Sequence, residues 1–218
     1  VYGPSAGRWV AVMSGTGSGS AYSTDGITWL TGTTTLGTGT WALCFGANKF
    51  LAVCTASQTV ATSTDGNTWT LTALALPSAS TWASVAWGSI GIFVAIAAGG
   101  TIAASSTDGI TWVARTLPAS AAWTSVTWGN GRFVAIASGG ATAAYSLDGI
   151  SWYASSLPTA TTWTSVGYGQ GHFMAVASGT SSAATSPDGL TWTPRIIAAS
   201  ATWKAVTFGN PTKVPTWC

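Results

Sequence analysis

The chain has 218 residues, of which 6% are charged and 47% are hydrophobic, and its formal net charge is +2 at pH 7. This length suits one well-buried domain, and a charged fraction far below the usual value of roughly 25% predicts a nearly neutral surface rich in hydroxyl groups. So small a net charge gives no basis for binding nucleic acid or acidic substrates. The longest apolar run, at residues 90–98, is about half of the roughly 18 residues that a membrane span needs, so no membrane insertion is predicted.

The number and spacing of the cysteines do not predict a disulfide scaffold. Cys44, Cys54 and Cys218 are an odd set without metal-ligand spacing. Cys44 stands where other repeats have Val, so we interpret it as a small core residue, and Cys218 is the thiol we single out for pairing between chains. The chain begins at Val1 without Met or a signal segment, which is consistent with a processed product or a piece of a longer polypeptide.

The sequence divides into repeats of about 40 residues. We place a partial repeat at 1–36, full repeats at 37–76, 77–117, 118–157 and 158–197, a partial repeat at 198–210, and a tail at 211–218. In the unit 118–157, alternation and Gly turns predict four short strands at 123–128, 133–137, 142–146 and 150–155. No stretch has a helical period, so the protein is predicted to be all-β.

A heptapeptide ending in Trp marks every repeat. Ser23-Thr24-Asp25-Gly26-Ile27-Thr28-Trp29 has near copies at 63–69, 106–112, 146–152 and 186–192. Asp-Gly between apolar or β-branched residues is a strong hairpin signal, because Gly readily takes positive φ and Asp binds nearby backbone N–H groups. We assign a structural turn role to Asp25, Gly26, Trp29, Asp65, Gly66, Trp69, Asp108, Gly109, Trp112, Asp148, Gly149, Trp152, Asp188, Gly189 and Trp192.

A second set of Trp residues opens each repeat: Trp41, Trp82, Trp123, Trp163 and Trp203. The two Trp sets are out of phase at the chain ends, so four full units lie between two complementary fragments. This pattern predicts a five-bladed β-propeller with four antiparallel strands per blade, whose last blade is closed by strands from both termini. Val1-Tyr2-Gly3 repeats the aromatic-Gly ending of Phe208-Gly209, so one of these two segments has to be displaced from that blade.

The Ser, Asp, Gly and Trp of the heptapeptide resemble the Asp-box (BNR-type) repeat of sialidase-like β-propellers. Gly-Asn-Gly-Arg-Phe-Val-Ala followed by Ser-x-Asp-Gly-x-Thr-Trp is also similar to repeats in phage tail and other virion-associated proteins. The resemblance implies a propeller with these turns at its outer hairpins. Sialidases use an arginine cluster, a Tyr with a carboxylate partner and an acid, and no position here matches that set, so the resemblance implies no sialidase activity.

The chemistry available to the chain is limited. The five acidic residues are all turn Asp residues, and there is no Glu. Glycoside hydrolysis needs two carboxyl groups within roughly 5 to 9 Å, which turns on different blades would not provide. His172 is the single histidine, and we interpret it as an exposed hairpin residue. We therefore predict that the protein is not an enzyme, with no catalytic residue, no metal site and no cofactor.

Two sets of residues are candidates for ligand binding. Arg8, Lys49, Arg132 and His172 precede an aromatic residue in equivalent turns. They either offset the Asp charges nearby, which we favour, or form an anion-binding ring. The second candidate set is the opening Trp residues Trp41, Trp82, Trp123, Trp163 and Trp203, which either pack between blades or stack on sugars.

Two functional hypotheses remain from the sequence. The first is a structural or adhesion module, extracellular or on a virion, whose partners are other protein subunits or a host surface with its glycans, in a larger assembly. The second is a lectin with repeated sites between blades. The first hypothesis is favoured because the chain lacks Glu and is poor in Lys, a composition typical of rigid extracellular or virion components.

Overall fold

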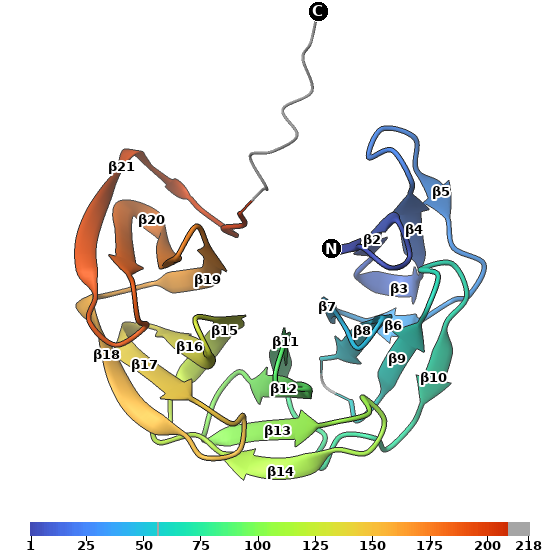
Figure 1. The fold of residues 1–218 in the computed structure, drawn as a ribbon, viewed down its shortest axis with the longest axis horizontal. Coiled ribbons are helices and arrows are strands. Elements are labelled where there is room, and N and C mark those ends of the chain that lie inside the picture. The colour runs from blue at the N-terminus through green and yellow to red at the C-terminus, as the bar shows by residue number, and fades with distance from the viewer. Residues whose placement is uncertain (56, 209–218) are drawn as a thin grey trace, which may run out of the picture.

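Alternating apolar and small polar residues give each repeat strands whose sheets can be covered on both faces. The computed structural model describes residues 1–55 and 57–208, and these residues form strands, turns and bends without a helix. The described residues therefore include no helix that could span a membrane. Five sheets, called blades 1 to 5 in chain order, follow one another around a ring (Figure 1). The predicted all-β, five-bladed β-propeller is confirmed.

The first four blades are antiparallel sheets of four strands each. Blade 1 contains β1 (Tyr2–Gly3), β2 (Arg8–Val12), β4 (Ser20–Ser23) and β5 (Leu30–Thr31). Blade 2 contains β7 (Trp41–Gly46), β8 (Lys49–Cys54), β9 (Val60–Ser63) and β10 (Thr70–Thr72). Blade 3 contains β11 (Trp82–Gly88), β12 (Ile92–Ala97), β13 (Ile102–Ser106) and β14 (Val113–Thr116). Blade 4 contains β15 (Ala122–Gly129), β16 (Arg132–Ser138), β17 (Gly140–Ser146) and β18 (Tyr153–Thr161).

Blade 5 keeps the same plan with a continuous middle segment. It contains β19 (Trp163–Gly169), β20 (His172–Ser186) and β21 (Thr193–Thr202). β20 covers the positions of both middle strands, with Gly179 at φ +74° where the segment reverses. The first half of β20 pairs with β19 and the second half with β21. Elsewhere, the short ribbon of β3 (Gly15–Ser18) and β6 (Gly37–Gly39) joins blade 1 to the connection into blade 2.

The outermost strand of blade 4 starts later than the sequence predicts. We expected it at 150–155, and β18 begins at Tyr153. The reason is local: Asp148 Oδ1 accepts hydrogen bonds from the N–H groups of Ile150 and Ser151, both at 2.8 Å. These bonds hold the residues after Gly149 in the turn, so they cannot pair with β17.

The hydrophobic core lies between the blades. Side chains on each second strand alternate between the preceding and the following blade. One cluster joins Val94 and Ile96 of blade 3 to Trp123 and Phe133 of blade 4. The first aromatic residue of each second strand in blades 2 to 5 is fully buried; these residues are Phe50, Phe93, Phe133 and Phe173. Each blade is thus stabilised mainly by its neighbours.

Glycine at the end of each first strand permits this close packing. A Cβ at Gly129 would overlap Tyr168 of the next blade, although the φ of Gly129 is not in the left-handed region. The same Gly and aromatic pair occurs at Gly3 with Phe45, Gly46 with Trp87, Gly88 with Trp128, and Gly169 with Phe208. The aromatic-Gly ending therefore serves contact between blades.

The closure of the last blade differs from the expectation. The sheet that contains β2, β4 and β5 takes its innermost strand from Tyr2–Gly3, with Tyr2 opposite Trp9. Residues 203–208 are not assigned to a strand and lie against blade 5 instead. Because Val1 to Gly3 already occupy the register that Phe208 would need beside Trp9, the C-terminal segment is the displaced one. The predicted tail at 211–218, with Cys218, lies outside the described residues.

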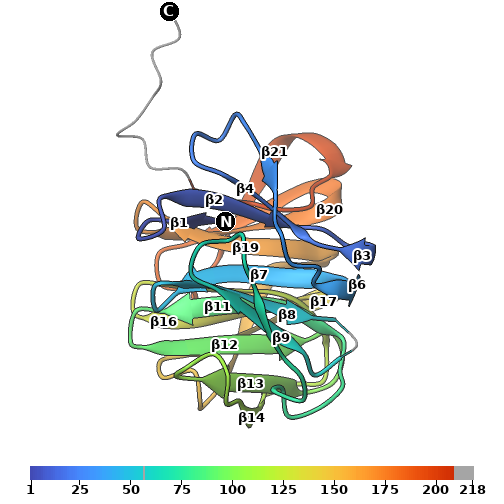
Figure 2. The same ribbon diagram turned by 90° about the vertical axis from the view of Figure 1, so that its right-hand side faces the viewer.

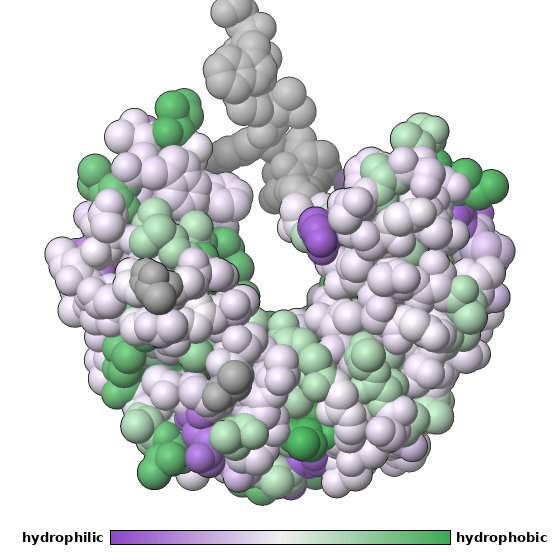
Figure 3. All heavy atoms as spheres, turned by 180° about the vertical axis from the view of Figure 1, so that it is seen from behind, coloured by the Kyte–Doolittle hydropathy of each residue, from purple (hydrophilic) through white to green (hydrophobic). Residues whose placement is uncertain are grey.

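The blades form an arc with two separate ends. Figure 1 shows β2 and β4 of blade 1 on one side of an opening and β19 to β21 of blade 5 on the other. Figure 2 shows the same blades from the side, with β2, β7, β11 and β12 one below another in that view. The space-filling view has a hollow centre that opens toward the gap between the two ends (Figure 3). Within residues 1–55 and 57–208, no further blade covers the outward sheet faces at the two ends of the arc.

Candidate functional site

The Asp turns share one hydrogen-bond pattern. In blade 1, Ser23 Oγ donates to Asp25 Oδ1 at 2.8 Å and accepts from the Gly26 N–H at 2.8 Å. Asp25 Oδ1 also accepts from the N–H groups of Ile27 and Thr28, at 2.8 and 2.7 Å. The other four turns repeat these bonds around Asp65, Asp108, Asp148 and Asp188. These bonds hold the Ser, Asp and Gly of each heptapeptide in one turn geometry.

The turn carboxylates are held in the ionised form. Hydrogen bonds from the N–H groups of Ile27 and Thr28 lower the pKa of Asp25 to about 2. At Asp108, partial burial alone would raise the pKa, but hydrogen bonds from the turn N–H groups outweigh it and lower the pKa to about 2. The pKa values of Asp65, Asp148 and Asp188 are also lowered. A carboxyl group of this kind is a poor proton donor near neutral pH.

These pKa values predict a loss of stability in acid. We expect the free energy of unfolding to fall between about pH 4 and about pH 2. A depressed folded-state pKa stabilises the fold above the unfolded pKa, and this stabilisation is lost as the pH falls through the folded pKa. Because the chain has five Asp and no Glu, the turns carry all the acidic side chains. Urea unfolding at stepped pH measures the effect, and a free energy of unfolding that rises from pH 4 to 2 would contradict it.

The turn Trp residues are buried in every blade except the first. Trp69, Trp112, Trp152 and Trp192 are between 5% and 9% exposed, whereas Trp29 is 45% exposed. The preceding blade makes the difference: Trp69 Nε1 donates to Ser20 Oγ of blade 1 at 2.9 Å. No blade precedes Trp29 in the described chain, so its ring is left partly in water.

Basic side chains of blades 1, 2 and 4 lie near the Asp turn of the following blade, whereas blade 3 has Ile92 at this position. Arg8 Nη1 donates to the carbonyl oxygen of Asp65 at 2.8 Å, and Lys49 Nζ donates to that of Asp108 at 2.9 Å. Arg132 lies close enough to Asp188 to lower its pKa further. His172 is exposed, with Nδ1 3.2 Å from the carbonyl oxygen of Gln170. The predicted set of basic residues thus lies on the face of the Asp turns, where Arg8 and Lys49 bind backbone of the next blade.

The Trp residues that open each repeat are mostly inaccessible. Trp82, Trp123 and Trp163 are fully buried, Trp41 is 7% exposed, and Trp203 is half-buried. The indole N–H groups of Trp82, Trp123, Trp163 and Trp203 donate to backbone carbonyls, for example from Trp163 to Thr159 at 3.0 Å, whereas that of Trp41 is buried without a hydrogen-bond partner. In blades 2 to 5 these rings therefore have no face on which a sugar could stack.

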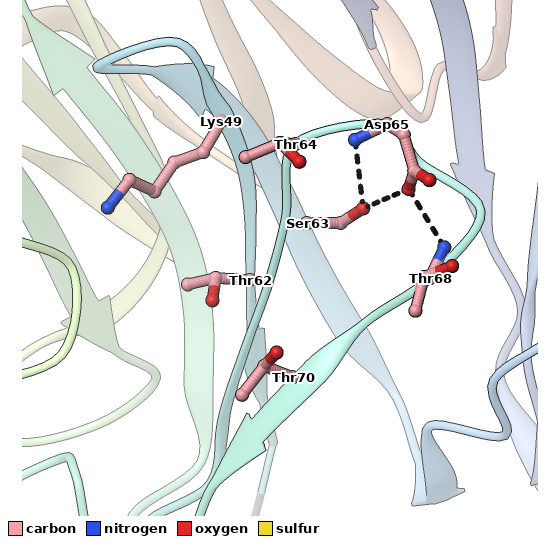
Figure 4. A pocket seen from close by; sticks show the side chains of 7 residues that line it. All are labelled: Lys49, Thr62, Ser63, Thr64, Asp65, Thr68 and Thr70. Carbon is pink, nitrogen blue, oxygen red and sulfur yellow. Dashed lines mark hydrogen bonds between the residues drawn. The ribbon is translucent and has the colours of Figure 1, made fainter.

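A shallow pocket lies beside the Asp turn of blade 2. It has a volume of about 270 Å³ and is lined by Lys49, Thr62, Ser63, Thr64, Asp65, Thr68 and Thr70. Figure 4 shows the Asp65 carboxylate turned toward Ser63 and Thr68, with Lys49 extending away from it. Both charged groups have partners already, since Lys49 binds the Asp108 carbonyl and Asp65 binds its own turn. The pocket offers hydroxyl groups to a ligand, and no acid and base within reach of each other.

Neither a metal site nor a reactive thiol is visible among residues 1–55 and 57–208. This part of the chain has no group of three His, Cys, Asp or Glu side chains that could hold a metal ion. Cys44 and Cys54 are free and buried, and burial raises the pKa of the Cys44 thiol. Cys44 belongs to the core cluster around Trp82, consistent with a packing role.

The exposed apolar side chains at the start of the chain form the most distinctive surface. We call this surface the leading face of blade 1; it consists of Tyr2, Trp9, Met13, Ile27 and Trp29, which are 44% to 76% exposed. The rings of Tyr2 and Trp9 lie 4.8 Å apart. The equivalent of Trp9 in every other blade is a fully buried Phe. Sequence analysis did not single out this face, although the out-of-phase repeats at the chain ends were a signal that one blade lacks a neighbour.

Comparison with known proteins shows the fold and no family. No protein-family model and no curated protein sequence matches the chain. A solved structure of virginiamycin B lyase from Staphylococcus aureus is similar with a TM-score of 0.76 and 13% identity, over 88% of this chain and 68% of that one. YCF48 bound to a D1 peptide has a TM-score of 0.61 and 16% identity, over 84% and 61%. A nidogen/laminin complex has a TM-score of 0.68 and 10% identity, over 93% and 82%.

These comparisons correct one prediction and limit another. The prediction that the protein is not an enzyme is contradicted, because the similar structures include virginiamycin B lyase, an enzyme. The same fold also occurs in YCF48, which is bound to a peptide, and in a complex of two proteins. The β-propeller part of the predicted resemblance is confirmed, while no matching family supports its Asp-box or phage-tail part.

Proposed function

We propose that this β-propeller is a structural or adhesion module that binds protein partners outside the cell or on a virion, through the leading face of blade 1. The observation that carries the proposal is the exposure of Trp29. Four equivalent Trp residues are at most 9% exposed under a neighbouring blade, and Trp29 is 45% exposed. A half-exposed Trp among apolar neighbours is the kind of residue that dominates protein interfaces.

The rest of the surface supports a module that makes contacts through one defined region. Only 6% of the residues are charged, so the exposed surface carries few charges. Such a surface gives little electrostatic attraction for partners, and an apolar patch on it is the strongest available source of affinity. Similar propellers in complexes with a peptide and with another protein make this use of the fold plausible.

The experiment is a paired screen of the purified chain against a peptide display library and a glycan array. We expect peptide binders and no saturable sugar binding, because the Trp rings that could stack on a sugar in blades 2 to 5 are buried. The selected binders are then titrated against Trp29→Asp. This variant should bind at least roughly thirtyfold more weakly if Trp29 is an interface hot spot.

Leu147→Ser is the matched control. Leu147 is 54% exposed in the Asp turn of blade 4, so its replacement removes a similar apolar side chain from the middle of the arc. Its affinity for the selected binders should equal that of the unmodified chain. Saturable sugar binding that Trp29→Asp leaves unchanged would instead establish a lectin and reject the proposal.

A further inference from the structure

We propose that the leading face of blade 1 receives blade 5 of a second copy of this chain, so that the copies associate head to tail. This inference rests on the proposed function, because it names a partner for the same surface. Blades 1 to 5 meet at four interfaces of one design within the chain. The two ends of the arc carry the two halves of a fifth interface of that design.

The first two residues that would meet in this fifth interface are Met174 of blade 5 and Gly26 of blade 1. In blades 1 to 4, the residue after the first aromatic of the second strand is fully buried and lies against the Gly of the next Asp turn. These pairs are Val10 with Gly66, Leu51 with Gly109, Val94 with Gly149, and Val134 with Gly189. Met174 holds this position in blade 5 and is only partly buried. At Gly26 the nearby side chain is Trp9 of the same blade, so the place of a preceding blade is open.

The second contact across this interface would join His172 of blade 5 to the Asp25 turn of blade 1. Arg8 and Lys49 each donate to the carbonyl of the next turn Asp. His172 holds the equivalent position in blade 5, is exposed, and has no following turn in the described chain. Docking blade 5 of one copy before blade 1 of another would bring His172 to the Asp25 carbonyl. Blade 3 has Ile92 at this position, so the polar contact supplements the apolar one.

Residues 203–208 already lie where the first strand of a following blade belongs. The Val206 N–H donates to Ser165 Oγ at 3.1 Å, as the Val166 N–H does to Ser125 Oγ at 3.2 Å one blade earlier. Thr164 Oγ1 donates to the Trp203 carbonyl at 2.9 Å, which repeats the bond from Thr124 Oγ1 to Trp163. We call Met174, His172 and residues 203–208 the trailing face of blade 5.

Blade 1 lacks most of this first strand. β1 has 2 residues, whereas β19 has 7. By the register of β19 with β20, Phe208 of a second copy would lie opposite Trp9, Val206 opposite Ala11, and Trp203 opposite Met13. Only Val1 to Gly3 would have to leave. Adding a strand to the open edge of β2 would supply backbone hydrogen bonds as well as apolar contacts.

The shape of the arc favours a second copy over closure within one chain. The two ends are separated in Figures 1 and 3, and bringing them together would change the angle at all four interfaces. The match with virginiamycin B lyase covers 88% of this chain and 68% of that longer chain, so the arc resembles part of a longer structure. Such a head-to-tail contact repeats without closing and gives open-ended assemblies.

The test uses two variants that each lose one half of the contact. Trp29→Asp places a charge on the leading face, and Met174→Asp places one on the trailing face. In sedimentation velocity from low micromolar to near-millimolar protein, the unmodified chain should form species that grow with concentration. Each variant alone should be monomeric, with self-association weakened at least roughly thirtyfold. A mixture of the two should form a dimer and nothing larger, because one intact face of each kind remains.

Controls separate this proposal from misfolding and from the proposed function. Leu147→Ser should assemble as the unmodified chain does, and all variants should keep the same circular dichroism spectrum. A chain that stays monomeric at every concentration, or variants that do not combine, would overturn the head-to-tail contact. A monomer in which Trp29 and Met174 are protected from hydroxyl radicals would overturn it in favour of self-closure. If Trp29→Asp still weakens the peptide binders while no copy associates, this inference fails and the proposed function stands.

Discussion

Replacing Phe133 by Ala is expected to lower the free energy of unfolding by about 3 to 5 kcal/mol. Phe133 is fully buried between blades 3 and 4, where it contacts Trp128 and Trp152 with ring centroids at 4.7 and 6.4 Å. Its removal would leave a cavity lined by stiff rings and strand backbone. Because each blade is stabilised by its neighbours, this loss should weaken two blades at once. Urea denaturation followed by tryptophan fluorescence measures it.

Trp9→Ala provides the internal control for Phe133→Ala. Trp9 has the same place in blade 1, but it is 44% exposed because no blade covers it. We expect the free energy of unfolding to fall by about 1 to 2 kcal/mol, since part of the Trp9 ring is already in water. Equal losses for the two variants would mean that blade 1 is covered in solution in a way that the single chain does not show.

The second large effect is expected at Gly109, where Ala should lower the free energy of unfolding by about 2 to 5 kcal/mol. Gly109 has φ +76°, which costs energy for any residue with a Cβ. Its Cβ would also lie 2.5 Å from Leu51 Cδ1 of blade 2. The substitution therefore adds an overpacked interface to a strained turn.

Gly131→Ala separates strain from overpacking. Gly131 has φ +74°, and a Cβ there would meet no atom within 4 Å. Only the cost of the left-handed backbone conformation should remain, so the free energy of unfolding should fall by about 1 to 2 kcal/mol. Thermal unfolding of both variants gives the comparison. If Gly131→Ala destabilised the chain as much as Gly109→Ala, contact between blades would not be the reason for Gly in the Asp turns.

The sequence determined the repeat, the strands and the turns, because these depend on residues close together in the chain. Asp148, Gly149 and Ser146 form their turn from neighbours within three residues, so the heptapeptide alone predicted it. The number of blades followed from the number of copies. The start of β18 was misplaced because the Asp-Gly pattern does not say how far beyond Gly149 the Asp148 carboxylate binds N–H groups.

The tertiary structure decided what the repeats could not distinguish. Trp29 and Trp112 occupy the same place in the sequence pattern, yet one is 45% and the other 7% exposed. Arg8 and Lys49 bind backbone carbonyls about 60 residues away, which no local pattern encodes. Residues 203–208 and β1 carry equivalent endings, and only the arrangement of the arc placed one on blade 5 and the other beside β2. The burial of a side chain and its hydrogen-bond partners depend on the neighbouring blades, and the repeat pattern does not show which blades have a neighbour.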